Sequence, residues 1–174
     1  MNDSEEIDGA ADDPEGTGDL AETIEEGAIE DVAYAYTIGM TDEETDRRLR
    51  EGSVGVLSLA DDGDSYAIPV AYHYDGDAVY IRLGLHADSR KTQMLQTTDT
   101  ACFLLYDADP IEESWSVMAT GSMRRVDDSS NFSDEVINSL FVPLRVFGEP
   151  IEGIEPAVFE LEVESLTGRR ATEE

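Results

Sequence analysis

Alternating apolar and polar residues along much of the chain predict a protein built mainly from β-strands. The expected strands are residues 53–60, 65–74, 78–83, 99–106, 115–126 and 157–167. Acidic and glycine-containing turns, such as 61–64 and 75–77, separate neighbouring strands. Six strands with few helices indicate a small β-barrel with flanking helices.

Two residues predict irregular strand pairing, and the last strand shows a regular two-faced pattern. Pro69 has no N–H to donate, so its strand should be bulged or exposed at an edge there. Gly121 indicates a bend or bulge in a long barrel strand. The last strand should have two distinct faces, with Val158, Glu160, Glu162 and Glu164 on one and Phe159, Leu161, Val163 and Ser165 on the other.

Three short helices are expected between the strands. Thr41 and Glu44 form a capping-box sequence, which starts a helix that ends at Gly52. Asp88 or Ser89 caps a second helix that reaches Thr98. Ser133 caps a third, interrupted near Pro143, whose apolar residues are Val136, Ile137, Leu140, Phe141, Leu144 and Val146.

Charge divides the chain into an acidic tail and a domain. Residues 1–36 contain thirteen acidic residues and no lysine or arginine, which is typical of a disordered segment, so the domain is expected at 37–174. The whole chain carries 41 acidic and 11 basic residues, a net charge of -30. Such a surface is typical of a halophilic cytoplasmic protein and repels nucleic acid and anionic membranes. An acidic protein that captures basic partners is the alternative.

The remaining composition limits the chemistry further. Cys102, the single cysteine, lies in an apolar run and is expected to be a buried, inert thiol. His73 and His86 have no partner at metal-ligand spacing, so no metal site is predicted. No apolar run is long enough to span a bilayer, and the acidic N-terminus is unlike a secretory signal, so a cytoplasmic location is expected.

The sequence Ser89-Arg90-Lys91 predicts an anion site. Lys91 is the only lysine of the chain, and it lies beside an arginine in the first turn of an expected helix. Cations there oppose the helix dipole, whereas first-turn N–H groups, a hydroxyl and two cations together suit a phosphate or carboxylate. The alternative is a solvated surface pair that offsets nearby carboxylates.

These segments, in this order, resemble a known family. Ile68-Pro69-Val70-Ala71-Tyr72, the 74–80 hairpin, Ser89-Arg90-Lys91, Ala101-Cys102-Phe103, Trp115-Ser116-Val117 and Gly121 resemble the pyridoxamine 5'-phosphate oxidase-like FMN-binding split barrels, over about residues 40–170. The branch that looks most similar is the one of uncharacterised oxidases and nitroimidazole-resistance proteins. The resemblance implies a six-stranded split β-barrel and a homodimer with FMN between its subunits.

The same resemblance implies where FMN would bind. Ser89, Arg90 and Lys91 would hold its phosphate, while Pro69, Val70, Ala71 and Tyr72 would lie along the isoalloxazine ring. Arg82, Leu83 and Gly84 would pass its other edge, and Trp115 and Ser116 would close the site from the same or the partner chain. His86, just before the anion-site helix, and His73 are further candidates to reach the flavin or substrate.

The C-terminal segment distinguishes between branches of this family. The C-terminal segment lacks the arginine-rich ending of true pyridoxamine-phosphate oxidases, and its Thr167-Gly168-Arg169 looks more like the ending of the uncharacterised branch. We therefore expect an FMN-dependent oxidoreductase with an unknown small-molecule substrate and no identified catalytic residue. The alternatives are a non-catalytic flavin-binding or sensing module, a deazaflavin-dependent reductase, and haem binding through histidine as in some relatives.

Overall fold

The computed structural model describes residues 35–126, 132–143 and 151–172. The chain divides into two units, Met1–Tyr34 and Ala35–Glu174, and only residues of the second are described. The predicted acidic tail therefore lies, up to residue 34, outside the described residues. Leu144 and Val146 of the third expected helix also fall outside them.

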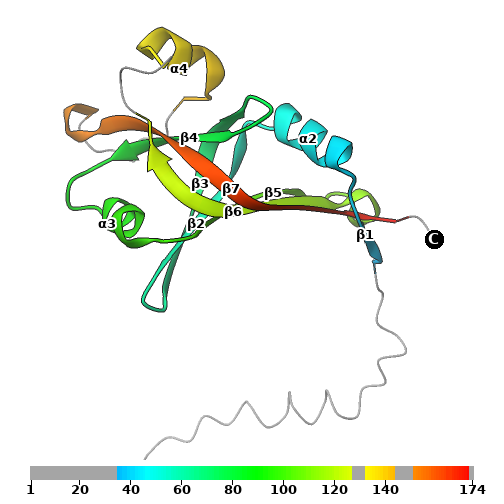
Figure 1. Cartoon of the computed structure of the whole chain (residues 1–174). Helices are drawn as coiled ribbons and strands as arrows, with labels where there is room; N and C mark the ends of the chain where they lie inside the picture. Colours follow the sequence, from blue (N-terminus) through cyan, green and yellow to red (C-terminus); the bar gives the residue numbers. More distant parts are fainter. Residues whose placement is uncertain (1–34, 127–131, 144–150, 173–174) are drawn as a thin grey trace, which may run out of the picture. The chain divides into compact units, whose positions relative to one another are not determined.

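Seven antiparallel strands form the domain, and six of them close into a barrel (Figure 1). The neighbour order is β1-β7-β4-β3-β2-β5-β6, and β6 also pairs with β7, which closes the ring. This confirms the split-barrel fold predicted from the sequence. The strands are β1 (Thr37–Gly39), β2 (Val54–Asp61), β3 (Asp64–Tyr74), β4 (Val79–Leu85), β5 (Ala101–Asp107), β6 (Trp115–Arg125) and β7 (Glu155–Ala171).

The helices begin where the capping sequences place them. In α2 (Asp42–Glu51) both hydrogen bonds of the Thr41–Glu44 capping box are present, and Gly52 is the C-cap. Helix α3 (Arg90–Thr97) is capped by Ser89, and α4 (Asp134–Leu140) by Ser133. Helix α4 ends at Leu140 with Phe141 as its C-cap, shortly before Pro143, because a residue that precedes a proline rarely adopts helical geometry. Short 3-10 turns η2 (Ile111–Glu113) and η3 (Ile151–Gly153) complete the described elements.

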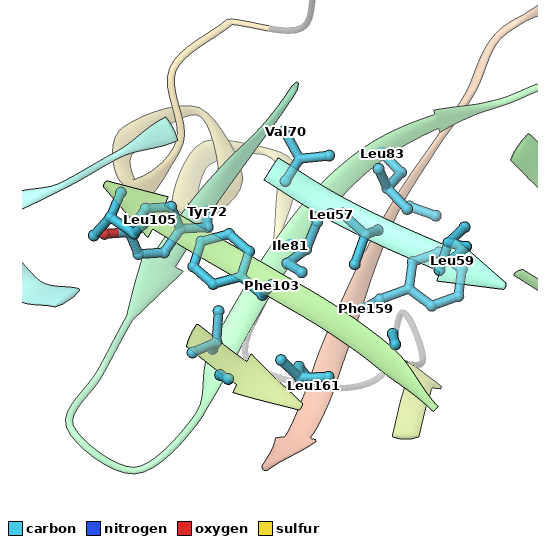
Figure 2. Packing of buried hydrophobic residues seen from close by; sticks show 14 of the residues in the cluster. Leu57, Leu59, Val70, Tyr72, Ile81, Leu83, Phe103, Leu105, Phe159 and Leu161 are labelled. Carbon is cyan, nitrogen blue, oxygen red and sulfur yellow. The ribbon is translucent and has the colours of Figure 1, made fainter. Parts of the chain in front are cut away.

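Alternate residues of the strands fill the barrel interior (Figure 2). Leu57 of β2, Phe103 of β5 and Leu161 of β7 are completely buried, and Tyr72 of β3 packs edge-on against Phe103 at 4.8 Å between ring centroids. The Tyr72 hydroxyl donates to the Leu49 carbonyl of α2 over 2.8 Å, which joins the helix to the core.

Strand pairing shows how the chain behaves at Gly121 and at Pro69, the two positions where the sequence predicts an irregularity. At Gly121 the β6–β7 register shifts, and a Cβ there would lie 2.8 Å from the backbone carbon of Glu162, so the predicted bulge is confirmed and requires glycine. Pro69 pairs with Val56 of β2 in regular register, whereas pairing with β4 starts only at Ala71. The edge-exposed alternative for Pro69 is therefore correct, and the bulge alternative is wrong.

Two predictions about the last strand, β7, were incomplete. The last strand continues to Ala171, where it pairs with β1, a strand that the sequence pattern did not predict. The expected two faces of β7 hold only in part, because Val158 on the supposedly polar face is buried and Val163 is 37% exposed. Val158 lies opposite Arg82 in the interior of the sheet, whereas the bulge at Gly121 changes the register near Val163.

Within the described ranges, no helix has both the length and the apolar character needed to cross a membrane.

Candidate functional site

The start of helix α3 is held by a small network of hydroxyl groups. The Ser89 side chain accepts from the Thr92 N–H at 3.2 Å, and the Thr92 hydroxyl donates to the His86 carbonyl at 2.7 Å. The Ser89 N–H donates to the same carbonyl at 3.1 Å. These bonds fix the loop before the helix. The N–H groups of the first helical turn have no acceptor within the helix, and the fixed loop gives them a defined direction.

The first turn of α3 contains Arg90 and Lys91 and no acidic residue. The partial positive charge of the helix N-terminus and two cationic side chains are therefore concentrated at this end of the barrel. This is the local arrangement that the sequence predicts for an anion site.

Arg90 also contacts the hairpin between β2 and β3, to which α3 lies close in Figure 1. Its guanidinium donates to the Ser65 carbonyl at 3.3 Å, lies 3.9 Å from an Asp64 carboxylate oxygen and is 5.7 Å from the centre of the Tyr66 ring. The ion pair is exposed and contributes little to stability. Arg90 therefore links the helix to the β2–β3 hairpin.

The predicted ring-binding residues of β3 and β4 divide between the two faces of the barrel wall. The side chains of Val70, Tyr72 and Leu83 are buried in the core. Because successive side chains of a strand alternate, Pro69, Ala71, Arg82 and Gly84 lie on the outer face. A ligand on the outer face could reach only the backbone of the buried three.

Tyr72 shows most clearly why its side chain belongs to the core. It is 1% exposed and its hydroxyl is bonded to Leu49, and burial raises the pKa of Tyr72 to about 12. The period-two reading that pairs Tyr72 with Tyr74 on one face is supported, since Tyr74 packs against the same core cluster.

Trp115 and Ser116 lie at the opposite end of the barrel from α3. Trp115 pairs with Asp107 at the end of β5 and with Arg170 at the end of β7, and the Arg48 guanidinium of α2 stacks over its ring at 4.5 Å. Helix α3 instead lies where β5 begins and the β2–β3 hairpin turns. The structure therefore does not bring Trp115 and Ser116 together with Ser89, Arg90 and Lys91 within one protomer.

An apolar row crosses the outer face of the sheet between these two ends. The register aligns Pro69, Val56, Leu104 and Met118 on adjacent strands β3, β2, β5 and β6. Met118 is 45% exposed, and Tyr106, two residues along β5 from Leu104, is 59% exposed. We refer to Val56, Leu104, Tyr106 and Met118 as the outer apolar face.

Helix α4 and the residues beside it cover another part of the outer wall, which the sequence pattern did not predict. Phe141 packs 6.3 Å from His73, and Phe132 lies 5.0 Å from Tyr80, between ring centroids. Asn138 accepts from the Arg82 guanidinium at 3.5 Å. Only the apolar spacing of α4 could have indicated that it packs on the sheet, and that spacing does not say which strands it covers.

The described residues contain neither a grouped set of metal ligands nor an activated thiol. Within residues 35–126, 132–143 and 151–172, no three histidine, cysteine or acidic side chains are grouped so that they could hold a metal ion. Cys102 is half-buried on the barrel wall, and burial raises the pKa of its thiol, which disfavours the reactive thiolate.

Comparison with known proteins identifies the family. Residues 41–170 match the pyridoxamine 5'-phosphate oxidase family, which is most of the chain. The chain belongs to this family. The match spans the barrel from the α2 capping box into β7, and so includes the predicted anion site at the start of α3. No curated protein sequence is significantly similar to the chain.

Several solved structures share the fold at low sequence identity. A FAD-binding protein from Mesorhizobium loti is 17% identical with a TM-score of 0.59, and the alignment covers 80% of this chain and 100% of that one. A FAD-binding protein from Mycobacterium smegmatis is 19% identical with a TM-score of 0.59, covering 79% and 100%. A FAD and haem binding protein from the same organism is 15% identical with a TM-score of 0.57, covering 79% and 74%. These likenesses show that the chain shares the fold of these proteins.

Proposed function

We propose that this family member is a homodimeric FMN-binding oxidoreductase of the cytoplasm, acting on a small molecule. The observation that carries the proposal is the start of α3, where a fixed N-cap serine, two cationic side chains and first-turn N–H groups share one end of the barrel. A dianionic phosphate is the group that such an arrangement binds best. Binding it would also remove the conflict between Arg90, Lys91 and the helix dipole.

The outer wall beside α3 suits a flat ring. Pro69, Ala71 and Gly84 present small or rigid groups on the outward side of β3 and β4, so a planar ligand can approach the backbone there. FMN would supply hydride or electron transfer at its ring, and the protein would supply orientation and control of water and oxygen access.

A homodimer would complete the site. Trp115 and Ser116 lie at the end of the barrel away from α3, so they can face the flavin only from a second protomer. The outer apolar face between the two ends offers the exposed Met118 and Tyr106 for such a contact. Under this proposal each of the two sites takes its phosphate from one subunit and its closing residues from the other.

FAD is the second candidate cofactor, because all three of the similar structures above are named as FAD-binding proteins, one of them binding haem as well. The nitroimidazole-resistance-like branch and a halophilic source stay predictions, as does the absence of nucleic-acid partners. A binding or sensing module without turnover and a deazaflavin reductase remain distinguishable alternatives, since the first shows no substrate-dependent reduction and the second ignores FMN.

The decisive experiment is purification in high salt followed by an absorption spectrum. Flavin bands, with FMN rather than FAD released on denaturation, support the proposal; a colourless protein that ignores added FMN, FAD and deazaflavin refutes it. Size-exclusion chromatography with light scattering tests the dimer. Turnover with a nicotinamide donor then separates an enzyme from a binding module.

A charge-matched pair of variants locates the phosphate. Arg90→Ala with Lys91→Ala should weaken FMN binding by about 3 kcal/mol or more, since charge-assisted contacts are worth about 1.5–3 kcal/mol each. Arg124→Ala with Arg125→Ala removes the same charge from the exposed end of β6 and should change the affinity little. Equal FMN affinities in the two double variants would mean that Arg90 and Lys91 are a solvated surface pair and do not bind the phosphate.

A further inference from the structure

Arg82 differs from most other arginines that the structure describes. Arg50, Arg90, Arg124, Arg125 and Arg170 each pair with a carboxylate. In the described part of the chain, Arg82 has no carboxylate partner, and its only hydrogen bond is the 3.5 Å contact to Asn138, at the outer limit for such a bond. Its Nε is buried and has no acceptor among the described residues.

A buried guanidinium N–H without an acceptor is costly. The Nε of Arg48 is also buried without an acceptor among the described residues, but Arg48 lies within ion-pair distance of Glu51, whereas Arg82 has no such carboxylate there. In a chain with a net charge of -30, a carboxylate partner for Arg82 would have been easy to provide. Two acidic residues of the neighbouring strand and turn are otherwise engaged: Glu160, opposite Tyr80 on β7, binds Arg124, and Asp75 accepts the N–H groups of Asp77 and Ala78.

The surroundings of Arg82 suit a small anion with an apolar body. On the same outer face, its neighbours Ala71 across β3 and Gly84 along β4 carry at most a methyl group. Beside them, His73 and Tyr80 form the next outward pair and support the Phe141 and Phe132 rings. A planar carboxylate fits this set of groups: the Phe141 and Phe132 rings, the Asn138 amide and the Arg82 guanidinium, which has no carboxylate partner among the described residues.

We propose that Arg82 and Asn138, under the cover of α4, recognise the carboxylate of the molecule that reacts at the flavin, which makes the substrate class an aromatic or other planar carboxylic acid. This inference rests on the proposed function for its link to the flavin, but not for the anion site itself. Ala71 and Gly84 lie on the face predicted for the flavin ring, so an acid stacked on that ring would bring its carboxylate toward Arg82. Asn138 positions the guanidinium rather than neutralising it.

Benzoate, with neutral benzamide as its matched control, tests the site. Binding is measured twice: from the change in the flavin spectrum of the FMN-loaded protein, and by calorimetry on the flavin-free protein. We expect benzoate to bind and benzamide not to bind. Arg82→Gln should weaken benzoate binding to the flavin-free protein roughly 10- to 100-fold, as expected for a lost charge-assisted contact. Because Arg82 also lies at the predicted edge of the flavin ring, the FMN affinity of the same variant is measured separately.

Three further proteins make the result specific. Arg82→Lys should restore part of the benzoate affinity, and Asn138→Ala should weaken it by a smaller factor. Arg124→Gln removes a nearby arginine that already has carboxylate partners and should leave benzoate binding unchanged. If Arg82→Gln does not fold by circular dichroism, the comparison of Arg82→Lys with Asn138→Ala decides in its place.

The outcomes separate this inference from the flavin proposal. Benzoate binding that ignores Arg82 in a protein that holds FMN overturns the inference and leaves the flavin function standing. Loss of FMN in Arg82→Gln also overturns it, because Arg82 would then serve the cofactor. Arg82-dependent benzoate binding in a protein that never binds flavin supports the anion site and removes the flavin function.

Discussion

The Tyr72 hydroxyl provides a sharp test of the core. It is buried and donates to the Leu49 carbonyl at 2.8 Å, and burial raises its pKa from 10.0 to about 12. Tyr72→Phe removes this bond and leaves the carbonyl without its donor. At pH 8 we expect the variant to lose about 1 kcal/mol of unfolding free energy, the usual net value of one hydrogen bond.

The pH dependence follows from the direction of the pKa shift. Because the folded pKa lies above the unfolded one, the stability linked to Tyr72 is fully present below pH 10 and is lost as the pH rises toward 12. At pH 11 this loss amounts to about 1 kcal/mol in wild type, from one pH unit of differential titration. Tyr72→Phe cannot suffer that loss, so the two proteins should be about equally stable at pH 11.

Urea unfolding followed by Trp115 fluorescence, from pH 8 to pH 11 at constant salt, measures both effects. Tyr36→Phe removes the hydroxyl of a 60% exposed tyrosine and should leave the unfolding free energy at pH 8 close to that of wild type. A constant difference between wild type and Tyr72→Phe across the range would refute the reasoning, because it would mean that the hydroxyl titrates normally in the folded protein.

Three other predictions concern the bulge, a turn and the outer apolar face. Gly121→Ala should destabilise the barrel by several kcal/mol in thermal unfolding, because the added Cβ would clash with the backbone of Glu162. That backbone cannot move away without breaking the β6–β7 pairing, and an unchanged unfolding midpoint would contradict the bulge. Asp75→Ala should cost about 1 kcal/mol at neutral pH, because the carboxylate accepts two backbone N–H groups. The backbone N–H groups of Ala78 and Asp77 lower the pKa of Asp75, so this cost should fade as the pH drops through that lowered pKa, and a cost that persists in acid would argue against it. Met118→Asp should convert the proposed dimer to a monomer in light scattering, because it places a charge in the outer apolar face, and a dimer that persists would place the interface elsewhere.

Local signals in the sequence were sufficient for most elements of the fold. The Thr41–Glu44 capping box and the Ser89 cap act over three residues, and both are present as predicted. The Gly121 bulge was predictable for a similar reason, because only glycine tolerates the approach of a neighbouring strand there. Strand β1 was not predictable, because Thr37–Gly39 has no alternation of its own and exists through pairing with β7.

The candidate site was predictable only where its residues are neighbours in sequence. Ser89, Arg90 and Lys91 form one turn, so their spacing already describes the anion site. Which face Tyr72 uses, and at which end of the barrel Trp115 lies, depend on register with distant strands. The placement of Asn138 on Arg82 depends on how α4 packs, and 55 residues separate the two side chains along the chain.

Strand β7 has a consequence for how the protein is made. It pairs with β1, β4 and β6, so the strand that leaves the ribosome last among the seven is the one that closes the barrel. Until it emerges, the nascent chain holds β4 and β6 with unpaired edges, a state in which chains associate with one another. Closure also joins segments far apart in sequence, so the rate of folding should be limited by the arrival of β7 rather than by the early hairpin of β2 and β3.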